Sequence, residues 1–307
     1  MTGINLYING MATVNFCGTA QERALLPEPD YKLYIPDAGM RRRMSRIIRM
    51  GISSALMALE SSGSNEIDAI VTGTGWGCLA DTEKFLISVL DNNERLLNPA
   101  SFIQSTSNTI GAQIALMLRD NHYNNTFVHG GSSFEAAIID ASMLAIEGRR
   151  RILVGGFDEL TPTKEHLLGR MGVWRKHIMG EGSTFFVLSP EDDKESSLGK
   201  IVALDIFGSS VCDSEIISRC RELLDSLGLS VCSLSAVVCG RDSLCNYFES
   251  MNIESEYFKT SCGEYPTSSA YALWRGVDLL ANAQRGEMVL VINSYLNEAS
   301  SAMLITK

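Results

Sequence analysis

The sequence has few side chains placed to act as a nucleophile, and the position best suited to one is a glycine. Residues 125–159 begin with a short apolar run ending in His129-Gly130-Gly131-Ser132-Ser133, followed by an amphipathic helical pattern and an apolar strand pattern. A strand that enters a helix through a tight turn directs backbone N–H groups and the positive end of the helix dipole at that turn. A cysteine there would have a lowered thiol pKa, but Gly131 has no side chain that could attack a substrate.

Four other side chains could act as the nucleophile in place of the missing thiol. Ser132 and Ser133 follow Gly131 directly, and His129 could be the base that a serine nucleophile needs; the alternative, which we favour, is that both hydroxyls cap the helix. Cys239 and Cys262 are the other two. For Cys262 we favour the alternative of a buried, unreactive thiol.

The composition excludes several classes of function. A net charge of −10 over 307 residues argues against broad electrostatic binding of nucleic acid. The eight cysteines form no CxxC pair and have no histidine at zinc spacing, so we expect reduced thiols, no metal and no cofactor. No signal sequence and no run of about 18 apolar residues is present, so we expect no membrane span and a cytoplasmic protein.

Apolar runs alternate with helical patterns along the whole chain, which predicts an α/β protein. A polar stretch at 191–197 suggests a boundary between an N-terminal half, 1–190, and a C-terminal half, 191–307. The segments 148–156 and 285–293 share a turn followed by an apolar strand pattern, which suggests duplicated halves. The predicted strands are 6–8, 67–71, 152–154, 184–188, 201–206, 236–238, 288–292 and 302–305; the predicted helices are 45–60, 82–90, 107–118, 133–147, 214–227, 243–251 and 267–283.

Several short motifs, in order, resemble those of the β-ketoacyl synthases, the condensing enzymes of the thiolase fold. They are Arg42-Arg43-Met44-Ser45-Arg46, the glycine loop 72–75, the stretches 98–102 and 105–108, Gly155-Gly156-Phe157-Asp158-Glu159, a Gly-Glu-Gly turn at 180–182, and Asn293-Ser294-Tyr295. The resemblance covers about 42–304. It implies two pseudo-repeated βαβαβ halves in an α/β/α/β/α arrangement, the second half being shortened.

The resemblance also implies where catalytic groups would stand. The family's cysteine corresponds to Gly131, its first histidine to Cys239 and its second histidine to Glu264, while the family's lysine is retained as Lys259. Condensation needs a thiolate that accepts an acyl chain and donors that stabilise an enolate. A thiol is a weak donor, and an ionised carboxylate only accepts, so we expect no ordinary ketosynthase turnover.

Three functions remain open. The first is a non-catalytic subunit of the chain length factor type, which pairs with an active ketosynthase in fatty acid or polyketide synthesis; by analogy such pairs also make aryl polyene pigments. The second is an acyltransferase whose nucleophile has moved to Cys262, Cys239, Ser132 or Ser133, and the third is a homodimeric binding or scaffolding protein. An acyl carrier protein is the expected partner of the first two, and the arginines at 41–43, 46 and 49 could meet it or a partner subunit, or form a solvated helix face. Residues expected to face a pocket or a carrier are Asn108, Ser132, Ser133, Lys259, Cys262 and Asn293.

Overall fold

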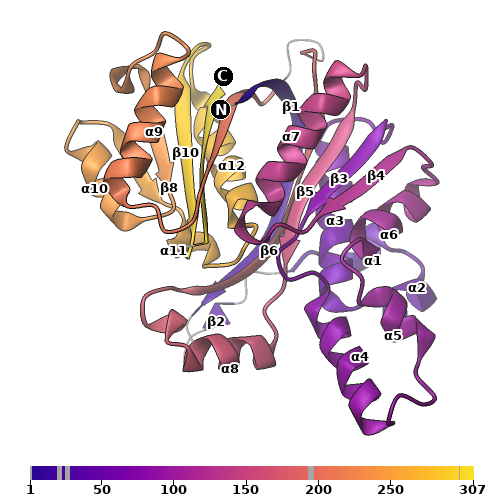
Figure 1. Cartoon of the computed structure of the whole chain (residues 1–307). Helices are drawn as coiled ribbons and strands as arrows, with labels where there is room; N and C mark the ends of the chain where they lie inside the picture. Colours follow the sequence, from indigo (N-terminus) through magenta and orange to yellow (C-terminus); the bar gives the residue numbers. More distant parts are fainter. Residues whose placement is uncertain (1, 19–22, 25–27, 193–196, 297) are drawn as a thin grey trace.

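The computed structural model describes residues 2–18, 23–24, 28–192, 197–296 and 298–307. Its strands form one sheet with the order β4-β3-β5-β6-β1-β7-β11-β10-β8-β9, and β2 pairs with β1 beside that path (Figure 1). The strands are β1 (Thr2–Gly18), β2 (Arg23–Ala24), β3 (Ala69–Gly73), β4 (Tyr123–Phe127), β5 (Ile152–Asp158), β6 (Met179–Ser189), β7 (Gly199–Phe207), β8 (Ala236–Cys239), β9 (Glu254–Tyr257), β10 (Met288–Tyr295) and β11 (Ala299–Thr306).

Helices connect these strands, and most of the predicted ones are confirmed within a few residues. Those predicted from periodicity are α3 (Arg46–Ser61), α4 (Leu79–Asp91), α6 (Thr109–Leu118), α7 (Ser133–Ile146), α9 (Asp213–Asp225), α10 (Asp242–Glu249) and α12 (Ser268–Leu279). Five others are short or lie in predicted loops: α1 (Tyr31–Tyr34), α2 (Ala38–Arg43), α5 (Pro99–Gln104), α8 (Pro162–Arg170) and α11 (Lys259–Cys262).

The two halves repeat one strand order. If the strands of the N-terminal half, β1 and β3 to β6, are numbered one to five, their order across the sheet from its edge is three, two, four, five, one. Strands β7 to β11 of the C-terminal half, numbered in the same way and read from the opposite edge, have the same order. The repeated segments 148–156 and 285–293 fall on β5 and β10, the fourth strand of each half. The predicted α/β fold with duplicated halves is therefore confirmed. The division into domains at residue 190 stays a prediction, because β1 hydrogen-bonds to both β6 and β7.

The strand side chains alternate between a central layer and two outer layers. In the N-terminal half, Val71 and Val154 pack toward α7 and α12, whereas Ile70 and Leu153 pack toward α3 and α6. In the C-terminal half, α9 and α10 cover the outer face. The result is five layers, with α7 and α12 buried between the two half-sheets (Figure 1).

Two local predictions are wrong. Gly180-Glu181-Gly182 lies within β6 rather than in a turn, since Met179–Ser189 pairs with β1 and β5 throughout. The arginines also do not share one helix: Arg41–Arg43 belong to α2, whereas Arg46 and Arg49 belong to α3, and Met44 and Ser45 separate the two.

Candidate functional site

The head of α7, where the glycine was singled out, meets the end of β10. Gly131 lies in a 3-10 turn, η1 (Gly130–Ser132), directly before α7, and is buried. A Cβ atom built on Gly131 would lie 2.6, 2.7 and 2.9 Å from Cδ1, Cβ and Cγ of Tyr295, distances that real Cβ contacts do not show. The aromatic ring therefore fills the space in which a nucleophilic side chain would begin.

Strand geometry explains why Tyr295 reaches this point. Val289 and Val291 of β10 face the central layer, so with a period of two Asn293 and Tyr295 face it as well. Tyr295 is 4% exposed. Burial raises the pKa of its hydroxyl, which a hydrogen bond from Trp76 opposes. The hydroxyl is thus neutral and is held in the interior.

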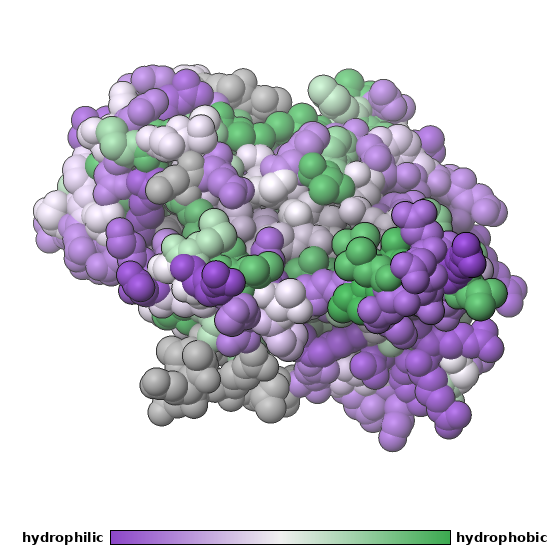
Figure 2. All heavy atoms as spheres, turned by 60° about the horizontal axis from the view of Figure 1, so that its bottom comes forward, coloured by the Kyte–Doolittle hydropathy of each residue, from purple (hydrophilic) through white to green (hydrophobic). Residues whose placement is uncertain are grey.

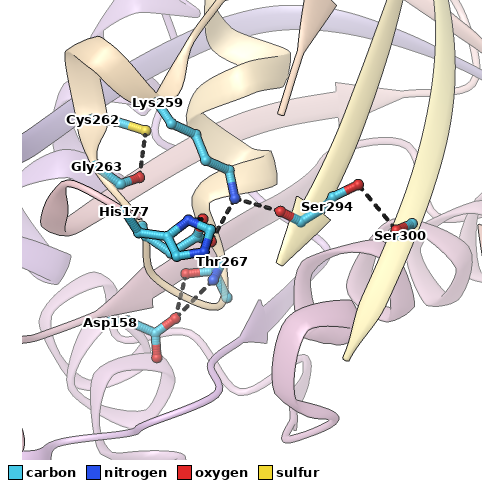
Figure 3. Close-up of polar contacts among 9 residues, drawn as sticks. Asp158, His177, Lys259, Cys262, Gly263, Thr267, Ser294 and Ser300 are labelled. Atoms are coloured by element: carbon cyan, nitrogen blue, oxygen red, sulfur yellow. Dashed lines mark hydrogen bonds and ion pairs between the residues drawn. The ribbon is translucent and has the colours of Figure 1, made fainter. Parts of the chain in front are cut away.

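Lys259 and Glu264 form a buried ion pair, and Glu264 lies near enough to Tyr295 to raise the pKa of its hydroxyl. Figure 3 shows Lys259 directed toward this site and toward Ser294. Lys259 Nζ lies 2.5 Å from Glu264 Oε1 and donates to the carbonyl oxygen of Ser294 at 2.5 Å. The two side chains are 1% and 3% exposed, so each charge depends on the other for its stability. Glu264 is fixed by its backbone too, because its N–H donates to Ile178 O at 2.7 Å.

A histidine to which the sequence assigned no role also reaches this pair. His177 Nδ1 lies 3.2 Å from Glu264 Oε2, and its side chain is 30% exposed (Figure 3). His177 stands in the loop before β6, where it follows no strand or helix periodicity. No pattern in the sequence points to His177, because the segment that carries it is brought to Glu264 by a backbone bridge between Met179 and Glu264, which are distant in sequence.

Asp158 ties the loops around the site together. Its Oδ1 accepts hydrogen bonds from Thr74 Oγ1, Gly75 N and Trp76 N at 2.9, 2.9 and 2.7 Å, and its Oδ2 accepts from Thr267 N and Oγ1 at 2.9 and 2.7 Å. Burial raises the pKa of Asp158 to about 6, and these donors limit the rise. The carboxyl group thus joins the glycine loop of the N-terminal half to the residue before α12; Figure 3 shows its bonds to Thr267.

The hydroxyl groups of the two serines next to Gly131 are used differently. Ser133 Oγ lies 2.8 Å from Thr74 O and from Gly130 O, and accepts from His129 N at 2.8 Å. Its hydroxyl is therefore used to hold the turn. The expectation of a cap at Ser132 is wrong, because its side chain makes no cap hydrogen bond to α7.

The two cysteines are buried away from any substrate. Cys239 was expected at a catalytic histidine's position, but strand parity overturns this: Val238 faces the central layer, and Cys239 faces the outer core under α9 and α10. A hydrogen bond with Cys245 and burial raise its pKa. Cys262 is fully buried, and its thiol donates to Gly263 O at 3.3 Å (Figure 3).

The two asparagines lie elsewhere. Asn108 precedes α6 and lines a surface hollow of about 600 Å³ together with Leu116, Arg119 and Asn124. Asn293 belongs to β10 and is buried near Glu135, which lies one turn along α7 from Gly131. The structure therefore brings Gly131, Lys259 and Glu264 together with Tyr295 and His177, and leaves Asn108 and Cys239 out.

As an assembly, these groups are suited to holding the head of α7 rather than to attacking a thioester. Gly131 has no side chain, Cys239 and Cys262 are buried, and the Ser133 hydroxyl is hydrogen-bonded. Ser132 is half-buried and makes no cap hydrogen bond. The carboxylate at position 264 is neutralised by a lysine. No group of three or more His, Cys, Asp or Glu side chains in the described ranges could hold a metal ion. Within the same ranges, no helix is long and apolar enough to cross a membrane.

Residues 21–167 match the family model described as "Beta-ketoacyl synthase, N-terminal domain". This stretch, 147 of the 307 residues, is similar to the N-terminal domain of β-ketoacyl synthases. The match begins before α2 and ends within α8, so it includes Gly131 and the whole of α7. The resemblance inferred from the short motifs is thus confirmed. A search of curated protein sequences gave no match.

Solved structures agree with the β-ketoacyl synthase assignment. The ishigamide ketosynthase/chain length factor superposes with a TM-score of 0.76 at 15% identity, covering 98% of this chain and 99% of that chain. The AntDE:AntF complex, a type II polyketide acyl carrier protein with its ketosynthase, has a TM-score of 0.73 at 14% identity and 99% coverage of both chains. A β-ketoacyl synthase from Burkholderia phymatum STM815 gives 0.73 at 13% identity, again with 99% coverage of both. At such identities the likeness establishes the ketosynthase fold and no more.

Proposed function

We propose that this chain is a non-catalytic ketosynthase-like subunit of the chain length factor type, which pairs with an active β-ketoacyl synthase in polyketide or fatty acid synthesis. The observation that carries the proposal is the Tyr295 ring packed against Gly131. A chain that had only lost its cysteine would leave room for one. Here the space is filled and the loss is built into the packing of β10 on α7.

The environment of Glu264 supports the same conclusion. Stabilising an enolate requires hydrogen-bond donors directed at the developing charge, and losing one such donor typically costs about 10²–10³ in rate. Glu264 is an acceptor held by Lys259 and faced by His177. The Glu264 carboxylate therefore has no hydrogen bond to donate to an enolate.

The partner surface that we propose centres on β4. Among the described strands it pairs with β3 alone and ends the sheet, so its other edge offers free backbone groups for pairing with a second subunit. Large apolar side chains flank it on α6, after β4 and on α7; they are Leu116, Val128, Met143 and Ile146, of which Ile146 is 84% exposed. An unpaired strand edge with apolar flanks is a typical protein interface.

Exposed apolar side chains extend this surface onto the α4–α5 hairpin, which projects from the N-terminal half (Figure 1). The largest exposed fractions are those of Leu90 and Leu96, and Phe85 and Phe102 pair between the two helices. Viewed from below, Figure 2 shows apolar atoms gathered in patches among hydrophilic ones, including a group on the right, the side of the N-terminal half.

A carrier protein would meet a smaller part of the arginine cluster than the sequence suggested. Arg46 pairs with Glu28 and Glu181, and Arg49 lies over the Tyr31 ring, so both are used within the fold. Arg42 and Arg43 of α2 are exposed, and neither forms an ion pair within the described ranges. We propose these two as the contact for an acidic acyl carrier protein.

Co-expression with a cysteine-bearing ketosynthase encoded nearby tests the proposal. The two proteins should co-purify in equal amounts, and substitutions at the β4 surface should separate them. Product chain length should also change with substitutions in this chain. A stable homodimer that does not bind the ketosynthase would favour the scaffolding alternative instead. We also propose an aryl polyene product, which can be tested by isolating the compound.

The second candidate, a relocated nucleophile, makes a separate prediction. Acyl carrier protein thioesters would acylate Cys262, Cys239, Ser132 or Ser133, which intact-protein mass spectrometry detects. The burial of both thiols and the occupied hydroxyl of Ser133 predict no mass shift over hours. Acylation of the isolated chain would overturn the non-catalytic assignment.

A further inference from the structure

A carboxyl group lies buried between the two central helices, one turn along α7 from Gly131. Glu135 is 1% exposed, and its Oε1 accepts a hydrogen bond from Ser301 Oγ at 2.6 Å. Its Oε2 has no hydrogen-bond partner among the described residues. Half of the carboxyl group is therefore unsatisfied in the interior, where such a group is costly.

Three more unpaired polar atoms belong to side chains that face Glu135. Ser269 of α12 and Asn293 of β10 lie close enough to lower its pKa, although burial raises it more. Yet Ser269 Oγ and both amide atoms of Asn293 lack a hydrogen-bond partner within the described ranges. Polar atoms from different elements thus converge on the Glu135 carboxyl group, close enough to lower its pKa but outside hydrogen-bond geometry.

The charge on Glu135 is also unbalanced. No Lys, Arg or His side chain forms an ion pair with it in the described part of the chain, and only burial and hydrogen bonds act on its pKa. The nearby buried carboxylate of Glu264, by contrast, has Lys259. A buried carboxylate needs a proton, a cationic side chain or a bound cation.

The oxygen atoms around Glu135 are suited to binding a cation. We propose that Glu135 Oε2, Asn293 Oδ1, Ser269 Oγ and Ser301 Oγ bind one monovalent cation, Na⁺ or K⁺. Carboxylate, amide and hydroxyl oxygens are the ligands that hard cations take. A single carboxylate balances one positive charge, whereas a divalent ion usually has more carboxylates around it.

Such an ion would join four elements: α7 from the N-terminal half and α12, β10 and β11 from the C-terminal half. It would contribute to stability wherever the cation exceeds its dissociation constant. The inference does not depend on the proposed subunit role, since it concerns only the contact between the halves.

Thermal unfolding of the full chain tests the site. At equal ionic strength, the wild type should melt about 2–4 °C higher in sodium or potassium chloride than in choline chloride, whose cation is too large to enter. The rise should saturate with the concentration of the alkali cation. Glu135→Gln, which keeps the shape and removes the charge, should abolish the difference.

Glu256→Gln is the matched control, because Glu256 is a partly exposed carboxylate paired with Arg275, and it should leave the cation effect unchanged. Ser301→Ala removes one ligand and should reduce the effect, which keeps the test informative if Glu135→Gln does not fold. Equal melting temperatures of the wild type in all three salts would overturn the proposal, as would a difference that persists in Glu135→Gln. In either case Glu135 would be a protonated carboxyl group without a bound cation.

Discussion

The two halves share a strand order but differ in what they expose and what they bury. Among the described residues, the large hydrophobic side chains with substantial exposure lie mostly before residue 190, and only Leu227 and Met251 lie after it. The connections differ too: α4, α5 and α6 join β3 to β4, whereas α10 alone joins β8 to β9. The elaborated N-terminal half therefore carries most of the exposed apolar surface, which is where we propose that a partner binds, and the C-terminal half mainly completes the core.

The sheet edges show the same difference. β4, the edge of the N-terminal half, has apolar neighbours such as Val128 and Leu116. β9, the opposite edge, carries Glu254 and Glu256, and the latter pairs with Arg275. Charged residues on an edge strand discourage pairing with other chains. If the comparison is right, substitutions in the two halves will have different kinds of effect.

The largest expected effect is the loss of the buried ion pair in the C-terminal half. Lys259→Met leaves Glu264 buried without its lysine and should lower the free energy of unfolding by about 3–5 kcal/mol in urea denaturation. The double variant Lys259→Met, Glu264→Leu should recover most of that loss. Arg275→Met breaks the partly exposed pair with Glu256, also in the C-terminal half, and should lower the free energy of unfolding by at most about 1 kcal/mol. Similar costs for the two single variants would contradict this account.

The next effect is a pH dependence that originates in the N-terminal half. Burial raises the pKa of Glu159 to about 7, helped by Glu181 and Asp81, and raises that of Asp158 to about 6. Because these pKa values are raised, the two carboxyl groups keep their protons to a higher pH in the folded chain than in the unfolded chain. Stability should thus fall as pH rises from about 4.5 to about 7, by about 2–3 kcal/mol for Glu159 alone, and change little above that.

Glu159→Gln should flatten this pH profile, measured by urea unfolding at intervals of half a pH unit. Asp213, in the C-terminal half, has a lowered pKa, so Asp213→Asn should leave the profile above pH 4.5 unchanged. A wild-type stability that rises through this window would show that Glu159 is ionised in the folded protein.

A smaller effect is expected where the two halves meet. Gly131→Cys forces a side chain against the Tyr295 ring and should lower the free energy of unfolding by about 1–3 kcal/mol. Tyr295→Ala should be destabilising by itself, but the double variant should lose less than the sum of the two single losses. Strict additivity in this double-mutant cycle would mean that the ring and position 131 do not compete for space.

The smallest change in stability should accompany a clear change in association. Ile146→Asp, on the proposed partner surface, should change unfolding by less than about 0.5 kcal/mol. It should nevertheless weaken binding to the partner ketosynthase at least about tenfold, or about 1.4 kcal/mol, by calorimetry or co-purification. Leu227→Asp, at an exposed site of the C-terminal half, is the control and should leave binding intact. Equal effects of both variants would remove the distinction between the halves.

Much of this fold could be predicted from sequence because its core elements are strongly periodic. The buried stretches of α3, α7, β5 and β10 follow helical or continuous apolar patterns. β9 escaped prediction because Glu254–Tyr257 is a polar edge strand without an apolar run. β1 was predicted over 6–8 only, although it spans Thr2–Gly18, since polar residues interrupt its pattern.

The site was less predictable, because it depends on contacts between distant segments. The sequence identified Gly131, Lys259 and Glu264 by position, and the structure brings them together. It could not show that Tyr295 would pack on Gly131 or that His177 would reach Glu264 from a loop. The error at Cys239 comes from strand parity, where a shift of one residue moves a side chain to the opposite face.

The long first strand has a consequence for synthesis of the chain. β1 takes both of its long neighbours, β6 and β7, from residues 179–207. At ordinary translation speeds it would wait roughly 10–30 s on the ribosome before either neighbour emerges. During that interval a 17-residue strand has both edges open, so newly made chains should depend on chaperones far more than the finished molecule does.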